Sequence, residues 1–299
     1  MTDPNFFVVG AGRCGTTSLH RFLGEHPEVF VCARKSPNHF AAHIPQPTWE
    51  TPVARAMSRQ WVADGDAYRS LFDDVGPEVA IGDVSPVYLQ ALDIAPRIHS
   101  ACPDARIIAI LRDPVDRAHS HFVGRQRDGI ETYADFAERV DLELSSPLPV
   151  DVAFGHLLGC GRYHHFLAPY LRYFGADRVK VLVHDDLINE PAALLKDIFT
   201  FIGVDPEFDP DMEARLNRTG VIRSRSARAA WTRSVGVRTA LRPHVPERVR
   251  TFVGRGFLTH IDKPLLDPQL RRRLVEVYRD DIAALEAMLD RDLSHWLAP

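Results

Sequence analysis

Hydrophobic residues along the chain gather in four short runs, separated by longer segments with helical spacing. The runs lie at Phe6–Val9, Val79–Ile81, Ile107–Leu111 and Val179–Val183. Apolar runs of this length, bounded by polar residues, are typical of buried strands. Because helical patterns lie between most of them, the pattern predicts an α/β fold with a parallel sheet and helices on both faces.

Three other segments repeat apolar residues at the spacing of a helix that packs on a sheet. One follows the first run, one follows the last run and one lies near the C-terminus. Their apolar positions are Leu19, Phe22 and Leu23; Ala193, Leu194, Ile198, Phe201 and Ile202; and Tyr278, Ile282, Leu285 and Leu289. The prolines at 45–52 and the segment Ser145–Pro149 predict loops, and not domain boundaries. We therefore expect a single domain over residues 1–299.

The turn between the first run and the first helical segment reads GAGRCGTT from Gly10 to Thr17. Such a turn can hold a phosphate, because backbone N–H groups and the positive end of the helix dipole face the anion. Thr16 stands where the nucleoside triphosphatase loop carries its lysine. The cation lies inside the loop instead, at Arg13, where it can neutralise charge on a leaving group. The sequence therefore predicts a P-loop-like sheet with a phosphate site; a turn that only joins strand to helix is the alternative.

A second candidate site follows the third run. There Arg112, Asp113 and Pro114 lead into a predicted helix that contains Ser120. Ligands of parallel sheets collect at the carboxyl ends of the strands. Arg112 can grip a phosphate with its guanidinium fork, and Ser120 can add a hydroxyl. Two alternatives stay open: an Arg112–Asp113 pair that caps the helix, and Asp113 as the magnesium ligand of a triphosphatase.

Composition narrows the classes of function. The 299 residues carry 36 Lys and Arg against 40 Asp and Glu, so no overall basic field attracts nucleic acid or an anionic membrane. The four cysteines and the paired histidines lack the spacing of metal ligands. No apolar run approaches the roughly 20 residues of a membrane span, and no basic leader precedes the first run. We expect a cytoplasmic protein with no metal site, no membrane span and no nucleic-acid partner, of undetermined oligomeric state.

Taken in order, the motifs resemble the sulfotransferases that use 3′-phosphoadenosine 5′-phosphosulfate (PAPS), particularly the bacterial branch similar to heparan sulfate sulfotransferases. Residues 12–18 resemble the family's 5′-phosphosulfate loop, and residues 110–121 its 3′-phosphate motif. Arg34–Phe40 (RKSPNHF) resembles the family's Lys-Glu-Pro-His-Phe-Phe segment, and Gly82–Tyr88 (GDVSPVY) its Gly-Glu-x-Ser/Thr-Pro-x-Tyr segment. Later landmarks are Gly161–Tyr163, Asn217–Thr219, Arg223–Ser226 and Asp292–Trp296. The resemblance spans nearly the whole chain, and implies transfer of a sulfuryl group from PAPS to a hydroxyl or amine of a small-molecule, lipid or carbohydrate acceptor.

The resemblance also assigns roles to residues of this sequence. Arg13, Cys14, Gly15, Thr16, Thr17 and Ser18 would bind the 5′-phosphosulfate; Arg112 and Ser120 would bind the 3′-phosphate; Tyr163, Arg223, Ser224 and Arg225 would close over the nucleotide. A solvated basic loop is the alternative for the last three. No metal is needed in principle, because in-line transfer depends mainly on positioning and charge stabilisation.

Two positions depart from the family pattern. Arg13 replaces the usual loop lysine; an arginine can hold charge but does not readily donate its proton. Ser36 stands where many heparan-type relatives carry a glutamate base, so the base must lie elsewhere. Asp83, near the end of a predicted strand, is the first candidate, and His39 is the second. Lys35 would orient the sulfuryl oxygens or an acidic acceptor, and structural roles are the alternatives for all three.

Two rival functions stay open. A P-loop kinase or triphosphatase is disfavoured by Thr16, and a non-catalytic nucleotide-binding protein is kept open by Ser36. We expect the acceptor pocket in residues 38–75 and 125–160, because loops vary without changing the fold. The aromatic residues Trp49, Trp61, Tyr68 and Phe72 predict either a partly apolar acceptor or a helix packed on the sheet.

Overall fold

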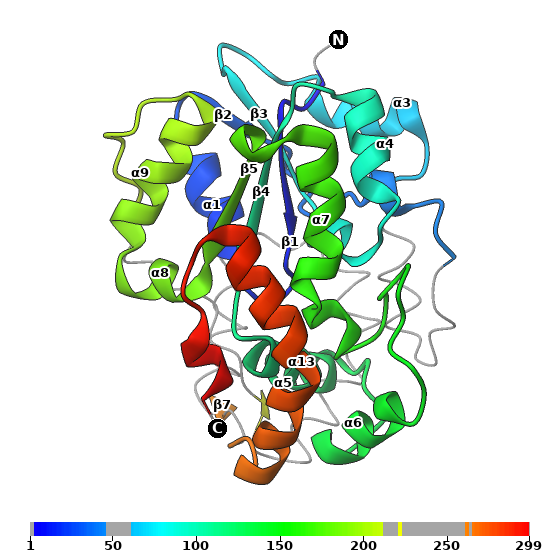
Figure 1. Ribbon diagram of the computed structural model, residues 1–299. Helices are drawn as coiled ribbons and strands as arrows, with labels where there is room; N and C mark the ends of the chain where they lie inside the picture. Colours follow the sequence, from blue (N-terminus) through cyan, green and yellow to red (C-terminus); the bar gives the residue numbers. More distant parts are fainter. Residues whose placement is uncertain (1–2, 46–60, 212–220, 223–260, 263–264, 299) are drawn as a thin grey trace.

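The centre of the molecule is a five-stranded sheet in the order β2-β3-β1-β4-β5, with every pair of neighbours parallel (Figure 1). The computed structural model describes residues 3–45, 61–211, 221–222, 261–262 and 265–298, with the backbone alone for 221–222 and 261–262. The strands are β1 (Phe6–Gly10), β2 (Val29–Val31), β3 (Ala80–Val84), β4 (Arg106–Leu111) and β5 (Val179–Val183). A separate antiparallel pair joins β6 (Val221–Ile222) to β7 (Ile261–Asp262). The predicted fold class is confirmed.

Helices flank the sheet on both sides. Figure 1 shows α1, α8 and α9 on one side, and α4 and α7 on the other. The α-helices are α1 (Thr16–Glu25), α3 (Gly65–Arg69), α4 (Ile94–Ala101), α5 (Pro114–Asp128), α6 (Phe136–Leu144), α7 (Tyr163–Phe174), α8 (His184–Asn189), α9 (Pro191–Ile202) and α13 (Pro268–Leu289). Short 3-10 turns are η1 (His39–Ala41), η2 (Ser70–Phe72), η3 (Pro86–Gln90), η4 (Gly159–Gly161), η5 (Ala176–Arg178) and η7 (Ser294–Leu297). Because the central strands are covered on both faces, every residue of β1 and β3 is buried.

The predicted helical stripes form the core of the layers. Leu19, Phe22 and Leu23 of α1 are buried, as are Tyr278, Ile282 and Leu285 of α13. The stripe on α9 is narrower than predicted: Leu194, Ile198 and Ile202 are buried, but Ala193 is exposed and Phe201 half-buried. One cluster of buried hydrophobic side chains includes residues from Phe6 to Trp296. A single domain over 1–299 stays a prediction, because much of 212–264 lies outside the described residues.

The strand pattern holds with two differences. The run predicted at Val79–Ile81 begins one residue later and reaches Val84, and Val79 itself is 57% exposed. The short strand β2 was not predicted, because three apolar residues give too little periodicity. Within the described parts of the chain, no helix is long and apolar enough to cross a membrane.

The strand order decides which residues meet at the carboxyl edge of the sheet. Strand β1 lies between β3 and β4, and β5 lies on the far side of β4. The residues that follow these strands are Ser85, Ala11, Arg112 and His184. Both sequence motifs therefore end at one edge, where ligands of parallel sheets collect.

Candidate functional site

The loop between β1 and α1 has the backbone of an anion cradle. Arg13 and Gly15 adopt φ angles of 77° and 97°, in the left-handed region. A side chain at Gly15 would place its Cβ 2.7 Å from a methyl group of Leu187, so the position requires glycine for two reasons. Among the described residues, no side chain caps the N-terminus of α1, so the N–H groups at its start have no side-chain partner there. These groups and the helix dipole can receive an anion.

The side chains of this loop divide between the core and the surface. Cys14 and Thr16 are buried, whereas Thr17 is exposed and Ser18 is half-buried. Burial raises the pKa of the Cys14 thiol to about 11, so this thiol stays protonated at neutral pH. The Cys14 and Thr16 side chains are therefore not available to a ligand, and the backbone N–H of Cys14 already donates to the oxygen of Ala11 at 3.2 Å. The hydroxyls of Thr17 and Ser18 remain accessible.

The Arg13 side chain turns from the loop toward α5. A Cβ built on Gly124 of α5 would lie 2.9 Å from the Arg13 guanidinium carbon. Burial, followed by the positive charge of Arg127, lowers the pKa of Arg13 to about 10, and Arg112 acts in the same direction. A pKa of 10 still leaves the guanidinium charged at neutral pH. Three arginines from different parts of the chain thus influence one another electrostatically beside the loop.

Arg112 follows β4 and points to the first turn of α5. Its Nη2 donates to Asp116 Oδ2 at 3.2 Å. Asp113 caps α5 instead, because its Oδ1 accepts from the backbone N–H groups of Val115 and Asp116. Its Oδ2 pairs with Arg271 at 2.6 Å. The Arg112–Asp113 pair that we considered is therefore absent from these contacts, and both Asp113 oxygens are engaged in structural roles.

Arg112 lines a cavity of about 320 Å³ at the carboxyl ends of β4 and β5. The other lining residues come from the starts of α5 and α8 and from the C-terminal turn: Asp113, Asp116, His184, Asp185, Ile188, Asn189, His295 and Trp296. Burial and then the charge of Arg112 lower the pKa of His184, which favours its neutral form. His184 was missed from the sequence, although it directly follows a predicted strand and the rule that selected Arg112 selects it as well.

The buried residue Tyr163 contacts both the loop after β1 and the end of β4. Its hydroxyl donates to the backbone oxygen of Arg112 at 2.9 Å and lies 3.8 Å from Cys14 Sγ. Its ring is only 1% exposed. Ser120 and Arg117, both on α5, are equally buried, and Arg117 donates to the backbone oxygen of Leu157. These contacts fix the phosphate loop and the end of β4 to the same support.

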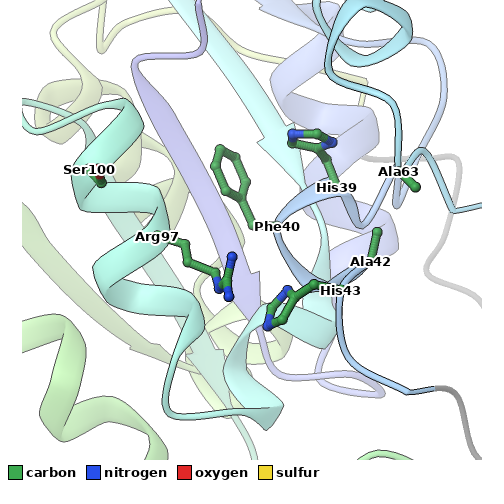
Figure 2. Close-up of a pocket in the computed structure, with 7 residues that line it drawn as sticks. All are labelled: His39, Phe40, Ala42, His43, Ala63, Arg97 and Ser100. Atoms are coloured by element: carbon green, nitrogen blue, oxygen red, sulfur yellow. The ribbon is translucent and has the colours of Figure 1, made fainter.

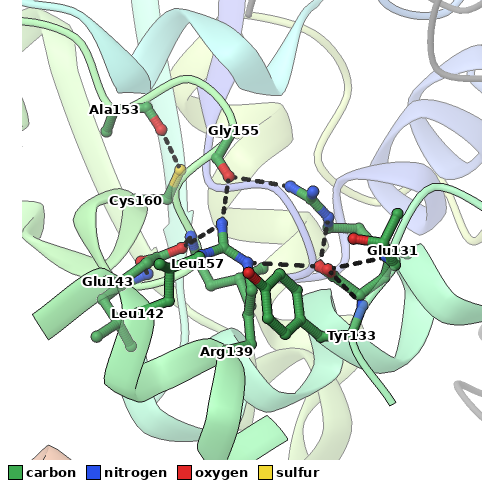
Figure 3. Close-up of polar contacts among 12 residues, drawn as sticks. Glu131, Tyr133, Arg139, Leu142, Glu143, Ala153, Gly155, Leu157 and Cys160 are labelled. Atoms are coloured by element: carbon green, nitrogen blue, oxygen red, sulfur yellow. Dashed lines mark hydrogen bonds and ion pairs between the residues drawn. The ribbon is translucent and has the colours of Figure 1, made fainter. Parts of the chain in front are cut away.

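That support includes the connection between α6 and α7, which a buried polar network holds in place (Figure 3). The Glu143 carboxylate accepts from the backbone N–H groups of Leu157 and Leu158 at 2.6 and 2.7 Å. Arg139 pairs with Glu143 at 2.9 Å. The backbone oxygen of Leu157 also accepts a hydrogen bond from Arg117. The network therefore orders the buried residues that support the site.

The two candidate bases lie close to each other near the carboxyl end of β3, which contains Asp83. Asp83 has no exposed surface, and its carboxylate accepts hydroxyl hydrogen bonds from Ser85, Tyr68 and Tyr88 at 2.6 to 2.9 Å. Burial raises its pKa, and these hydroxyls act in the opposite direction. The ring of His39 stacks on that of Tyr68, with centroids 4.2 Å apart. The Asp83 carboxylate and the His39 imidazole thus both contact Tyr68.

His39 is oriented by the backbone. Its Nδ1 lies 2.8 Å from the backbone oxygen of Val62; because a carbonyl can only accept, Nδ1 carries a proton, and in the neutral imidazole Nε2 is then an acceptor. His39 also lines a cavity of about 470 Å³ with Phe40, His43 and Arg97, among other residues (Figure 2). Tyr68, for which an acceptor contact and a packed helix were the two predicted alternatives, lies in α3 and is buried beneath the ring of His39.

The segment that carries Lys35 is fixed to the end of β3. The backbone N–H of Ser36 donates to the oxygen of Val84, and that of Asn38 donates to the Ser85 hydroxyl. Burial lowers the pKa of Lys35 to about 8. Among the described residues, no group of His, Cys, Asp and Glu side chains has the arrangement of a metal site. Trp49, Arg223, Ser224 and Arg225 lie outside the described residues.

A parallel α/β sheet with an uncapped helix start after β1 and an arginine after β4 is an arrangement in which α/β proteins commonly bind phosphate groups of ligands at the carboxyl edge. The model of the sulfotransferase family matches residues 4–210, and the chain belongs to this family. The predicted resemblance is confirmed, and it decides against the rival kinase.

Relatives and solved structures agree with this assignment. The chain is 27% identical over 203 residues to human heparan sulfate glucosamine 3-O-sulfotransferase 6, covering 67% of this chain and 52% of the relative. It is 26% identical over 210 residues to human bifunctional heparan sulfate N-deacetylase/N-sulfotransferase 2, covering 68% and 22%. It thus spans about a fifth to a half of the length of these curated relatives. A crystal structure of a sulfotransferase from Alicyclobacillus acidocaldarius superimposes with a TM-score of 0.75 at 29% identity, covering 100% of both chains.

Proposed function

We propose that this chain transfers the sulfuryl group of PAPS to a hydroxyl or amine of a small-molecule, lipid or carbohydrate acceptor. One observation carries the proposal: Arg13 and Arg112 follow the adjacent strands β1 and β4, around a phosphate loop that has no lysine. The donor has anionic groups at two positions, the 5′-phosphosulfate and the 3′-phosphate. Two guanidinium groups at one sheet edge match that distribution of charge.

In this proposal the loop binds the 5′-phosphosulfate through backbone N–H groups at the start of α1, with the hydroxyls of Thr17 and Ser18. Arg112 binds the 3′-phosphate, because its hydrogen bond to Asp116 uses only part of the donor capacity of a guanidinium. Ser120 stays a proposed second partner of this phosphate, although it is only 1% exposed in this structure. Tyr163 fixes the backbone of Arg112 through the hydrogen bond to its oxygen. Arg223, Ser224 and Arg225 close over the nucleotide, as the resemblance implies.

The reaction is an in-line displacement at sulfur. The acceptor oxygen or nitrogen forms a bond to sulfur and gives its proton to a base, while the bond from sulfur to the 5′-phosphate oxygen breaks. The leaving 3′-phosphoadenosine 5′-phosphate (PAP) gains a negative charge, which Arg13 stabilises electrostatically. No step in this scheme needs a metal ion in principle.

We propose His39 as the base, with Asp83 as its support. Both Asp83 oxygens already accept hydroxyl hydrogen bonds, and no part of this residue is exposed. The His39 Nε2 is an acceptor, and the ring lines the 470 Å³ cavity that we propose as the acceptor pocket. Asp83 then fixes Tyr68, on which the imidazole stacks.

Acceptor-dependent release of PAP from PAPS tests this assignment, measured across a panel of alcohols, phenols and amino sugars. We expect His39→Gln to lower kcat by roughly 100-fold, the usual effect of losing a general base, with PAP affinity unchanged. Asp83→Asn is the comparison. If a folded Asp83→Asn variant loses transfer while His39→Gln retains it, Asp83 is the base. PAP binding without transfer to any acceptor would favour the non-catalytic alternative.

A further inference from the structure

Helix α5 contains a glycine at position 124 that its backbone does not require. Gly124 is buried inside the helix, and its φ is not among the positive values of the described glycines. Glycine is a poor helix former, so its presence within a helix calls for a packing reason. The neighbour on this face of α5 is the end of the Arg13 side chain.

The fit between these two residues is close. A Cβ at Gly124 would lie 2.9 Å from Arg13 Cζ and 3.0 Å from each terminal nitrogen of the guanidinium. The contact with Cζ is shorter than real Cβ atoms show, and the two contacts with the terminal nitrogens are at the lower limit of tight contacts, so a larger residue must displace the guanidinium. The absent side chain of Gly124 therefore provides the space in which the flat guanidinium lies.

The charges around this space identify it as part of the anion site. The groups that act on the pKa of Arg13 include Arg127 and Asp128, in the last turn of α5, and Arg112 after β4. Arg127 and Asp128 pair with each other at 2.9 Å. The guanidinium thus lies against Gly124 of α5 and is close enough to Arg127, Asp128 and Arg112 to be affected by their charges.

We propose that Gly124 is a positioning residue for sulfuryl transfer, which sets the position of the Arg13 guanidinium relative to the leaving 5′-phosphate. The inference rests on the proposed function. It also explains how arginine fits where the family usually carries lysine. A planar guanidinium presents three atoms to the helix surface, whereas a lysine ammonium presents one atom that can rotate away.

Gly124→Ala is the direct test. The added methyl group displaces the guanidinium by about 1 Å, and misplacement on this scale costs roughly 10- to 100-fold in rate. We expect a loss of kcat within that range. The temperature of unfolding should not fall, because alanine is the better helix former and the methyl meets only the end of a flexible side chain.

Two comparisons separate this effect from a general one. Gly65→Ala adds the same methyl group to a helical glycine in α3, where the nearest guanidinium atom lies at 3.7 Å, and we expect it to leave kcat unchanged. In an Arg13→Lys background, we expect Gly124→Ala to change kcat by no more than about twofold, because the flat group is gone.

Full kcat in Gly124→Ala would overturn the inference. So would an equal loss in the arginine and lysine backgrounds, because Gly124 would then not act through Arg13. If the unsubstituted chain transfers no sulfuryl group from PAPS, the proposed function itself fails, and the inference fails with it.

Discussion

Lys35 lies half-buried between β2 and η1, and this burial lowers its pKa from 10.5 to about 8. The ammonium is therefore charged below pH 8 and loses its charge as the pH rises through that value. Since the unfolded chain keeps the higher pKa, it binds more protons than the folded chain between about pH 8 and 10.5. The Lys35 contribution to stability therefore rises with pH in this window, whereas its attraction for an anion falls.

A pH profile of Lys35→Met tests the role of this charge. At pH 7 we expect kcat/KM to fall about tenfold, the size of one charge-assisted hydrogen bond. The difference from the unsubstituted chain should shrink above pH 8, where the natural lysine is neutral too. Lys35→Arg stays charged and should not show the decline above pH 8. A constant ratio between the natural chain and Lys35→Met from pH 6.5 to 9.5 would contradict this role.

Single residues were predictable where a local motif carried the chemistry. The spacing of Gly10 and Gly15 and the position of Arg112 after a strand are visible in the sequence itself. The contact of Tyr163 with Cys14 is not, because 149 positions separate the two residues and only the fold brings them together. The same holds for Gly124 beside Arg13. His184 lacked a motif of its own and needed the strand-end rule applied to every strand.

At the scale of elements, the connection from α6 to α7 depends on the buried Glu143 carboxylate. This group satisfies two backbone N–H groups and pairs with Arg139. We expect Glu143→Gln to lower the free energy of unfolding by about 3 kcal/mol, because Arg139 loses one of its two carboxylate partners and an amide cannot accept at both ends. Urea-induced unfolding measures this value.

The exposed Glu138 on the same helix is the matched control. Glu138→Gln removes the same charge without a buried partner and should change the free energy of unfolding by no more than about 0.5 kcal/mol. Equal effects of the two substitutions would mean that the network around Glu143 does not stabilise the connection.

Apolar periodicity predicted most of the helices and strands named in the sequence analysis, but it missed some features. Strand β1 and helix α1 were predicted because buried runs and helical stripes are unambiguous when they are long enough. Strand β2 spans only Val29–Val31 and carries no such signal. The segment Ser145–Pro149 was predicted as a loop, but the network that orders the connection after it was not, since its charged groups look like ordinary surface residues in the sequence.

At the scale of the molecule, alternating strands and helices predicted a parallel sheet, but not the order of its strands. Only that order places β1 between β3 and β4, and so brings Asp83, the phosphate loop and Arg112 to one edge. Long-range pairing of this kind depends on packing between distant segments, which no local pattern encodes. The acceptor is likewise a property of loops, and part of the region predicted for it, residues 46–60, lies outside the described residues.

The central claim is that Arg13 and Arg112 form a donor site for a nucleotide with 3′- and 5′-phosphates, independent of metal. Isothermal calorimetry with PAP and no metal, beside ATP with Mg²⁺, measures this most directly. We predict PAP binding in the micromolar range, weakened roughly 100-fold by Arg112→Ala through loss of charge-assisted hydrogen bonds. Arg106→Ala, at the opposite end of β4, should leave it unchanged. If the chain binds ATP with Mg²⁺ but does not bind PAP, or if Arg112→Ala binds PAP as tightly as the unsubstituted chain, Arg112 is not part of such a donor site.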